Sequence, residues 1–115
     1  MCDRKDLVRL QHMLDASREA VSFAHNRSRE ELDTDRMLAL ALVKSIEITG
    51  EAASRLSKEC REKFPRIPWD NIVTMRNRLI HAYFDINLDV VWNTVIQDLP
   101  PLADELEKIL RTKET

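Results

Sequence analysis

The stretch MLALALV, from Met37 to Val43, is the longest wholly apolar run in this 115-residue chain. Either Asp33 or Thr34 can cap the start of a helix here, and the helical pattern continues to about Ser57 or beyond. A helix that packs along one stripe needs one apolar face, whereas this run is apolar all round. The sequence therefore predicts a helix covered on more than one side, either by sister helices alone or by a second subunit as well. Gly50 lacks bulk, so another helix could approach closely there.

Amphipathic helices are expected before and after this segment. From about Asp3 to His25, small and apolar residues recur at intervals of three and four. Residues 64–68 contain two prolines and cannot continue a helix, so a third helix is expected from about Trp69, fading around residues 82–87.

Asn87 can cap a fourth helix, which Pro100-Pro101 must kink or interrupt. Four long helices with short connections predict an all-α fold, an antiparallel four-helix bundle, as one domain over residues 1–115.

Composition restricts the class of protein. The formal net charge of −2 argues against a protein that coats nucleic acid through its overall field, but it allows a locally basic RNA site. Cys2 and Cys60 show no paired framework, so we expect free thiols in a reducing cytosol, with no disulfide needed for folding. The charged start is unlike a signal peptide, and the longest uncharged run is too short to cross a membrane. These features predict a cytoplasmic protein without a membrane partner.

The stretch MRNRLIHAYFDI, Met75 to Ile86, carries the candidate chemistry. Metal-independent RNA cleavage uses the neighbouring 2′-OH as nucleophile and needs proton transfer and positive donors to phosphate. His81 can exchange protons near neutral pH, Arg76 can bind phosphate oxygens, and Asn77 can bind phosphate or orient the imidazole. The alternative is a solvated helix face with an incidental histidine. The carboxylates are dispersed, and the three histidines lack metal-ligand spacing, so neither a metal nor another cofactor is expected.

The same stretch resembles the HEPN ribonucleases, and among them the HepT-type toxins that pair with minimal nucleotidyltransferase antitoxins. The resemblance extends to IEITGEAASRLS (46–57), IPW (67–69) and VWNTVIQDLPPL (91–102). It implies a HEPN-like bundle and an endoribonuclease toxin that acts as a homodimer on RNA. Its catalytic residues would be Arg76 and His81, with Asn77 and Arg78 as supporting phosphate contacts. It also implies that the antitoxin attaches adenylate to Tyr83.

Helical geometry leaves three arrangements of the motif open. Five residues along a helix rotate by about 140° and rise by about 7.5 Å, so Arg76 and His81 do not share a face. The helix can end near His81 and redirect it, the long arginine can wrap toward the next stripe, or a twofold-related subunit can supply the missing groups. One histidine cannot readily act as base and acid on opposite sides of phosphorus, which favours the dimer. DNA lacks the 2′-OH and is not an expected substrate.

Some residues and functions have competing interpretations. Trp69 and Trp92 are expected in the core rather than as platforms for bases. A cluster of basic residues follows the second helix and is interrupted by Glu59 and Glu62; it comprises Arg55, Lys58, Arg61, Lys63 and Arg66. We interpret this basic cluster as a solvated helix end. If it lies beside the motif, it could instead form a rim that guides RNA. The alternative function is a catalytically silent helical adaptor that binds a nucleotidyltransferase. An intact Arg76/His81 pair favours the enzyme.

Overall fold

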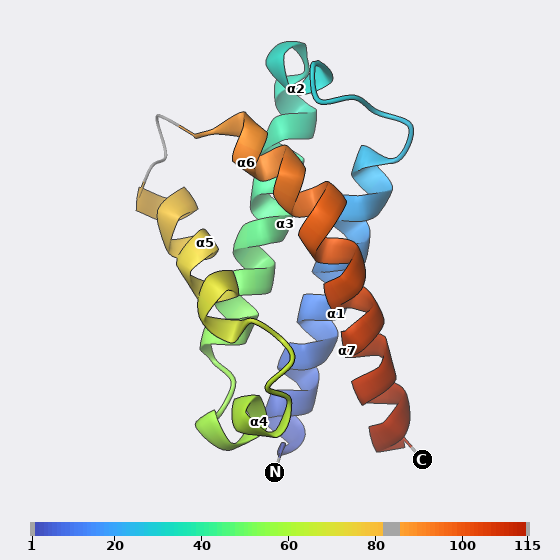
Figure 1. The fold of residues 1–115 in the computed structure, drawn as a ribbon, viewed down its shortest axis with the longest axis vertical. Coiled ribbons are helices and arrows are strands. Elements are labelled where there is room, and N and C mark those ends of the chain that lie inside the picture. The colour runs from blue at the N-terminus through green and yellow to red at the C-terminus, as the bar shows by residue number, and fades with distance from the viewer. Residues whose placement is uncertain (1, 82–85, 115) are drawn as a thin grey trace.

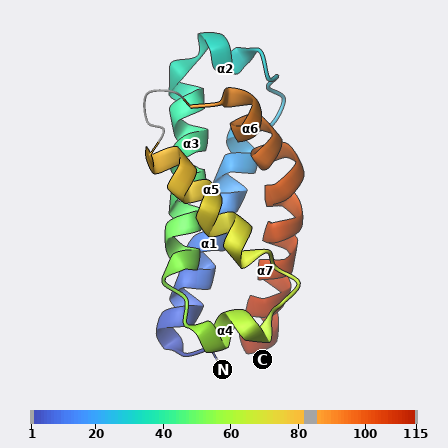
Figure 2. The ribbon, with the colours of Figure 1, turned by 60° about the vertical axis from the view of Figure 1, so that its left-hand side comes forward.

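The fold is an all-α antiparallel bundle, as expected (Figures 1 and 2). The computed structural model describes residues 2–81 and 86–114, and for residues 80, 81, 113 and 114 only the backbone is described. The elements are α1 (Arg4–Ala24), α2 (Glu31–Thr34), α3 (Arg36–Ser54), α4 (Lys58–Lys63), α5 (Trp69–His81), α6 (Leu88–Asn93), a π-helical turn η1 (Thr94–Asp98) and α7 (Leu99–Glu114). Within the described ranges, no helix is long and apolar enough to span a membrane.

The central helix α3 lies against α1 and α5. It begins after Asp35, whose carboxylate accepts a hydrogen bond from the Leu38 N–H at 3.0 Å. The start falls later than expected because residues 31–34 form the separate short helix α2. Sister helices bury one side of the apolar run, including Leu42, but Met37 is 84% exposed and Leu40 is 43% exposed. The outer face of α3 at its N-terminal end is therefore apolar, and no described residue covers it.

The last helix passes through both prolines without stopping. From α6 to α7 the backbone stays helical, but the turn before the prolines is π-helical, and the Leu99 N–H bonds the Thr94 carbonyl five residues back. Proline has no N–H to donate, so the widened turn lies where the regular ladder fails. The kink or interruption predicted at Pro100-Pro101 takes the form of this change in helix type, without a break in the helix. The predicted cap is also present: the Asn87 side chain accepts from the backbone N–H of Asp89 and Val90.

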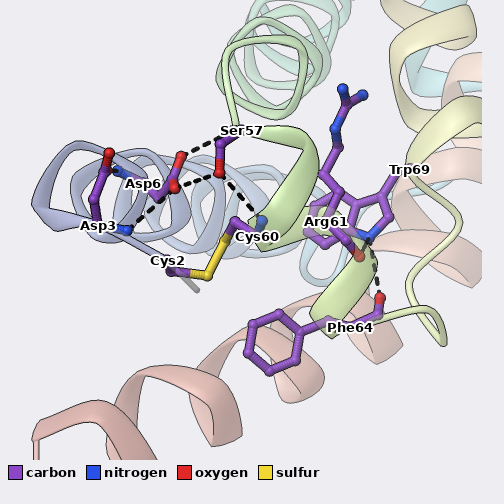
Figure 3. Close-up of a disulfide and its surroundings, with 8 residues drawn as sticks. All are labelled: Cys2, Asp3, Asp6, Ser57, Cys60, Arg61, Phe64 and Trp69. Atoms are coloured by element: carbon purple, nitrogen blue, oxygen red, sulfur yellow. Dashed lines mark hydrogen bonds between the residues drawn. A yellow bond between two sulfur atoms is a disulfide. The ribbon is translucent and has the colours of Figure 1, made fainter.

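The N-terminal turn of α1 is tied to the start of α4 (Figure 3). The buried Asp6 carboxylate accepts hydrogen bonds from the Ser57 N–H at 2.9 Å and the Ser57 hydroxyl at 2.7 Å. Asp6 also forms a capping box with Asp3. Burial alone would raise the pKa of Asp6, but the hydrogen bonds from Ser57 and Asp3 and the charge of Arg9 outweigh it and lower the pKa.

The expectation of two free thiols was wrong, because Cys2 and Cys60 form a disulfide. The two residues are 58 positions apart, and only the packing of α4 beside the start of α1 brings them together. Beside this link, the Trp69 indole N–H donates to the carbonyls of Arg61 and Phe64, both at 3.0 Å, at the end of α4. Trp69 is buried, as predicted for a core residue. The disulfide closes a long loop and so stabilises the fold by restricting the unfolded chain.

Asp6→Ala should lower the free energy of unfolding by about 1–3 kcal/mol, because the Ser57 N–H and hydroxyl lose a buried acceptor. Asp15→Ala, which removes an exposed carboxylate from the same helix, should change it by less than about 0.5 kcal/mol. The folded-state pKa of Asp6 lies below its ordinary value of 3.8. Its contribution is therefore present above that value and is lost as the pH falls through the folded-state pKa. Chemical denaturation at neutral and acid pH measures both effects, and an Asp6→Ala penalty that persists unchanged in acid would contradict them.

Candidate active site

The helix pair α3 and α5 positions Arg76. A Cβ atom added at Gly50 would lie 2.2 Å from the Arg76 Cβ, 2.8 Å from its Cγ and 3.1 Å from the Ile72 carbonyl oxygen. Only glycine leaves room for α5 at this distance, so the predicted close approach at Gly50 is the contact with the candidate catalytic arginine. The backbone of α3 thereby supports the first carbons of the Arg76 side chain.

The Arg76 guanidinium is held at its far end by two side chains of α3. Its Nη2 lies 3.2 Å from the Ser54 hydroxyl oxygen and 3.3 Å from the Glu51 Oε2. The Arg76 Nε is buried and has no hydrogen-bond partner among the described residues. The other Glu51 oxygen accepts from the Arg55 Nε at 2.9 Å. One carboxylate thus lies between two guanidinium groups, and Arg76, which is 19% exposed, keeps donors for a ligand.

A cleft of about 690 Å³ lies between α1 and α3 and reaches Arg76. It is lined by Arg4, Lys5, Val8, Arg9, His12, Lys44, Glu47, Ile48, Glu51, Ala52, Arg55 and Arg76, a set we call the basic cleft. Six of these residues are lysine or arginine and two are glutamate, in a chain whose formal net charge is −2. The basic cleft therefore concentrates positive charge around the candidate catalytic arginine.

The remaining motif residues are only partly located. Asn77 and Arg78 are exposed on α5. His81 is the last residue of α5 that the structure describes, and its side chain lies outside the described part of the chain, as does Tyr83. Among the described side chains, the structure joins Arg76 to Glu51 and Ser54.

Sequence reasoning missed the residues that surround Arg76. Glu51 is adjacent to Gly50, but nothing in its own sequence context pairs it with an arginine 25 positions later. On α1, Lys5, Arg9 and His12 recur at helical spacing, a signal that could have indicated a basic face.

The predicted basic cluster is divided by the fold. Arg55 lines the basic cleft, the next three members belong to α4, and Arg66 lines a different groove on the side of η1 and α7. Cys2, Asp6 and Cys60 form the one group of potential metal donors within the described ranges. The disulfide occupies both of its sulfur atoms.

Comparisons with known proteins identify the family. The family described as Ribonuclease HepT-like matches residues 13–109. A relative from Caldanaerobacter subterraneus subsp. tengcongensis, named "Putative RNase", is 36% identical over 91% of this chain and 94% of its own. "Probable ribonuclease HepT" of Thermococcus cleftensis is 36% identical over 70% of this chain and 73% of its own. No solved structure gives a significant match. The chain belongs to the HepT-like family of ribonucleases.

Proposed function

We propose that this chain is a metal-independent endoribonuclease and the toxin of a toxin–antitoxin pair, acting on RNA in the cytoplasm. Membership of the HepT-like family supports RNA as the substrate class. The observation that carries the proposal is the placement of Arg76: it is supported on Gly50, held by Ser54 and Glu51, and directed into a cleft of positive charge.

In the proposed reaction, the 2′-OH attacks the adjacent phosphorus while the bond from phosphorus to the 5′-oxygen breaks. The products are a 2′,3′-cyclic phosphate and a free 5′-hydroxyl. One imidazole removes the 2′-OH proton, and an imidazolium donates a proton to the leaving 5′-oxygen. The Arg76 guanidinium stabilises the added negative charge on the phosphoryl oxygens. Asn77 and Arg78, both exposed beside Arg76, supply additional phosphate contacts.

Two histidines are available if two copies of the chain face each other. The uncovered apolar side chains at the start of α3 support this arrangement, because Met37 and Leu40 are both exposed. Burying such apolar side chains in an isologous interface removes them from water, which favours dimer formation. The His81 side chain of one copy then acts as the base, and the His81 side chain of the other copy acts as the acid.

The chain should be a dimer at micromolar concentration, and Leu40→Asp should make it a monomer that no longer cleaves RNA. The aspartate would place a charge in the proposed apolar interface without crowding the core, because Leu40 is 43% exposed. Ile96→Asp is a matched control, since Ile96 is 46% exposed on η1 and outside α3. Light scattering measures the mass. A monomeric wild-type chain would argue against the shared active site.

Expression of the chain should arrest growth of a bacterial host, and His81→Ala or Arg76→Ala should relieve that arrest. Growth curves with matched protein levels provide the test of the toxin assignment. If neither the wild type nor the variants affect growth, while the chain still binds a nucleotidyltransferase, the adaptor function replaces the enzyme.

Co-expression with a minimal nucleotidyltransferase should add one or more adenylates at Tyr83 and suppress the growth arrest. Each adenylate brings a phosphodiester charge and a nucleoside near the motif, where they compete with RNA for the Arg76 guanidinium. Tyr83→Phe should keep most cleavage activity yet escape modification, as intact-mass spectrometry would show. Suppression of the arrest without a change of mass would mean that the antitoxin acts by binding alone.

A further inference from the structure

The basic cleft extends well beyond the motif, and most of its cations come from α1 and α3. We propose that it binds the sugar–phosphate backbone of single-stranded RNA next to the scissile bond, with Arg4 and Lys5 as phosphate contacts. The proposal rests on the proposed ribonuclease function and adds the path that the substrate follows. Arg4 and Lys5 on α1 and Arg76 on α5 line the same cleft, so a chain bound along it runs from the start of α1 to the candidate catalytic arginine.

The cations of the cleft fall into two groups. The inner ones have protein partners: Arg9 donates to the Arg55 carbonyl at 2.6 Å, Lys44 lies 4.0 Å from Glu47, and Arg55 and Arg76 share Glu51. Arg4 and Lys5, by contrast, are exposed and form no ion pair with any described residue. The two unpaired cations are the ones whose charge is available to an anionic ligand.

Arg4 and Lys5 are the first two residues of α1, and the carboxylates of Asp3 and Asp6 lie at the same end of this helix. Both carboxylates are engaged within the protein: Asp3 accepts from the Asp6 N–H, and Asp6 accepts from the Asp3 N–H and from Ser57. The acids are therefore bound in the cap, whereas Arg4 and Lys5 are exposed and line the basic cleft.

The first turn of α1 is also fixed in place (Figure 3). The disulfide from Cys2 to Cys60 and the hydrogen bonds from Ser57 to Asp6 hold it on both sides of Arg4 and Lys5. These two residues therefore start from an ordered backbone, which reduces the entropy that RNA binding must overcome.

Two features of the cleft favour RNA over other occupants. Between the cations lie Val8, which is 49% exposed, and Ile48, which is 38% exposed, and these apolar surfaces suit the faces of riboses or unpaired bases. A second copy of this chain is a poor occupant, because a twofold contact centred on the cleft would face its cations with the same cations. A second copy bound at Met37 and Leu40 would leave the cleft open to RNA, since neither residue lines the cleft.

The test compares Arg4→Ala/Lys5→Ala with Lys108→Ala/Arg111→Ala, a control pair of exposed cations on α7. Both are made in the His81→Ala chain, so that the probe, a labelled single-stranded RNA of about 15 nucleotides, stays intact. The cleft pair should weaken RNA binding by at least about tenfold and reduce the slope of log Kd against log salt by about 1.4, or about 0.7 per contact. The control pair should change affinity by less than about twofold and leave the slope unchanged.

With His81 restored, the cleft pair should raise KM for RNA cleavage and leave kcat nearly unchanged, because Arg4 and Lys5 do not touch the reacting atoms. If the cleft variant and the control variant lose RNA affinity equally, or if neither loses any, the cleft proposal is wrong. Cleavage of RNA by the wild-type chain would still support the ribonuclease function in that case. A wild-type chain that neither cleaves nor binds RNA would overturn the ribonuclease function itself. Thermal unfolding separates these outcomes from misfolding. The Arg4→Ala/Lys5→Ala chain should unfold at nearly the same temperature as the wild type, because both side chains are exposed and form no ion pair with a described residue.

Discussion

Arg76→Ala should lower the rate of RNA cleavage by about 10²–10³-fold, because it removes the guanidinium proposed to stabilise the charge on the phosphoryl oxygens. His81→Ala should lower it by about 10²–10⁴-fold through the loss of proton transfer. Arg76→Lys should recover little of the loss, since an ammonium cannot reproduce the fork that Ser54 and Glu51 orient. Initial rates on a labelled RNA measure these effects.

The fold of each variant needs an independent check. Glu51 keeps Arg55 as a partner after Arg76→Ala, so no carboxylate is left without a cation, and the helical circular dichroism should be retained. A rate loss of less than about threefold in a folded His81→Ala chain would assign His81 to a structural role.

Gly50→Ala should destabilise the chain and reduce its activity together. At an ordinary helical position this change raises stability by about 0.5–1 kcal/mol, but here the new Cβ would lie 2.2 Å from the Arg76 Cβ. Two Cβ atoms cannot occupy that distance, so α5 must move away from α3. Overpacking of this kind lowers the free energy of unfolding by about 1–3 kcal/mol. A displacement of about 1 Å at Arg76 would also reduce cleavage by up to about 10²-fold.

A double-mutant cycle with Arg76→Gly tests the cause of that loss. Arg76→Gly removes both the Cβ and the Cγ that the new methyl group would meet, so the stability penalty of Gly50→Ala should shrink in this background. Some penalty should remain, because the Ile72 carbonyl oxygen is still 3.1 Å away. If Gly50→Ala stabilises the wild-type chain, the close contact between α3 and α5 is wrong.

The fold could be predicted from the sequence wherever the signal was local. The period of the apolar residues, the cap at Asn87 and the prolines before Trp69 each depend on neighbouring residues, and each matches the structure. The disulfide could not be predicted in this way. Cys2 and Cys60 meet only because α4 returns to the start of α1, which is a property of the packed bundle rather than of any spacing.

In the candidate site, too, the residues that are neighbours in the sequence could be predicted, and the contacts between helices could not. Arg76, Asn77, Arg78 and His81 follow one another on a single helix, so their residue types and order could be recognised from the sequence. The pairing of Arg76 with Glu51 joins two helices and depends on their crossing at Gly50. Gly50 itself indicated a close approach, but the sequence did not identify the helix that approaches. The cations of α1 are remote from the motif and enter the site only through packing.

The central claim, that these residues cleave RNA without a metal ion, is tested most directly by the ends of the RNA that the purified protein cuts in the presence of EDTA. We predict cleavage that EDTA does not inhibit, products that end in a 2′,3′-cyclic phosphate, and no cleavage of DNA of the same sequence, which lacks the nucleophilic 2′-OH. Loss of activity in EDTA that magnesium restores would contradict the account, as would products lacking the cyclic phosphate.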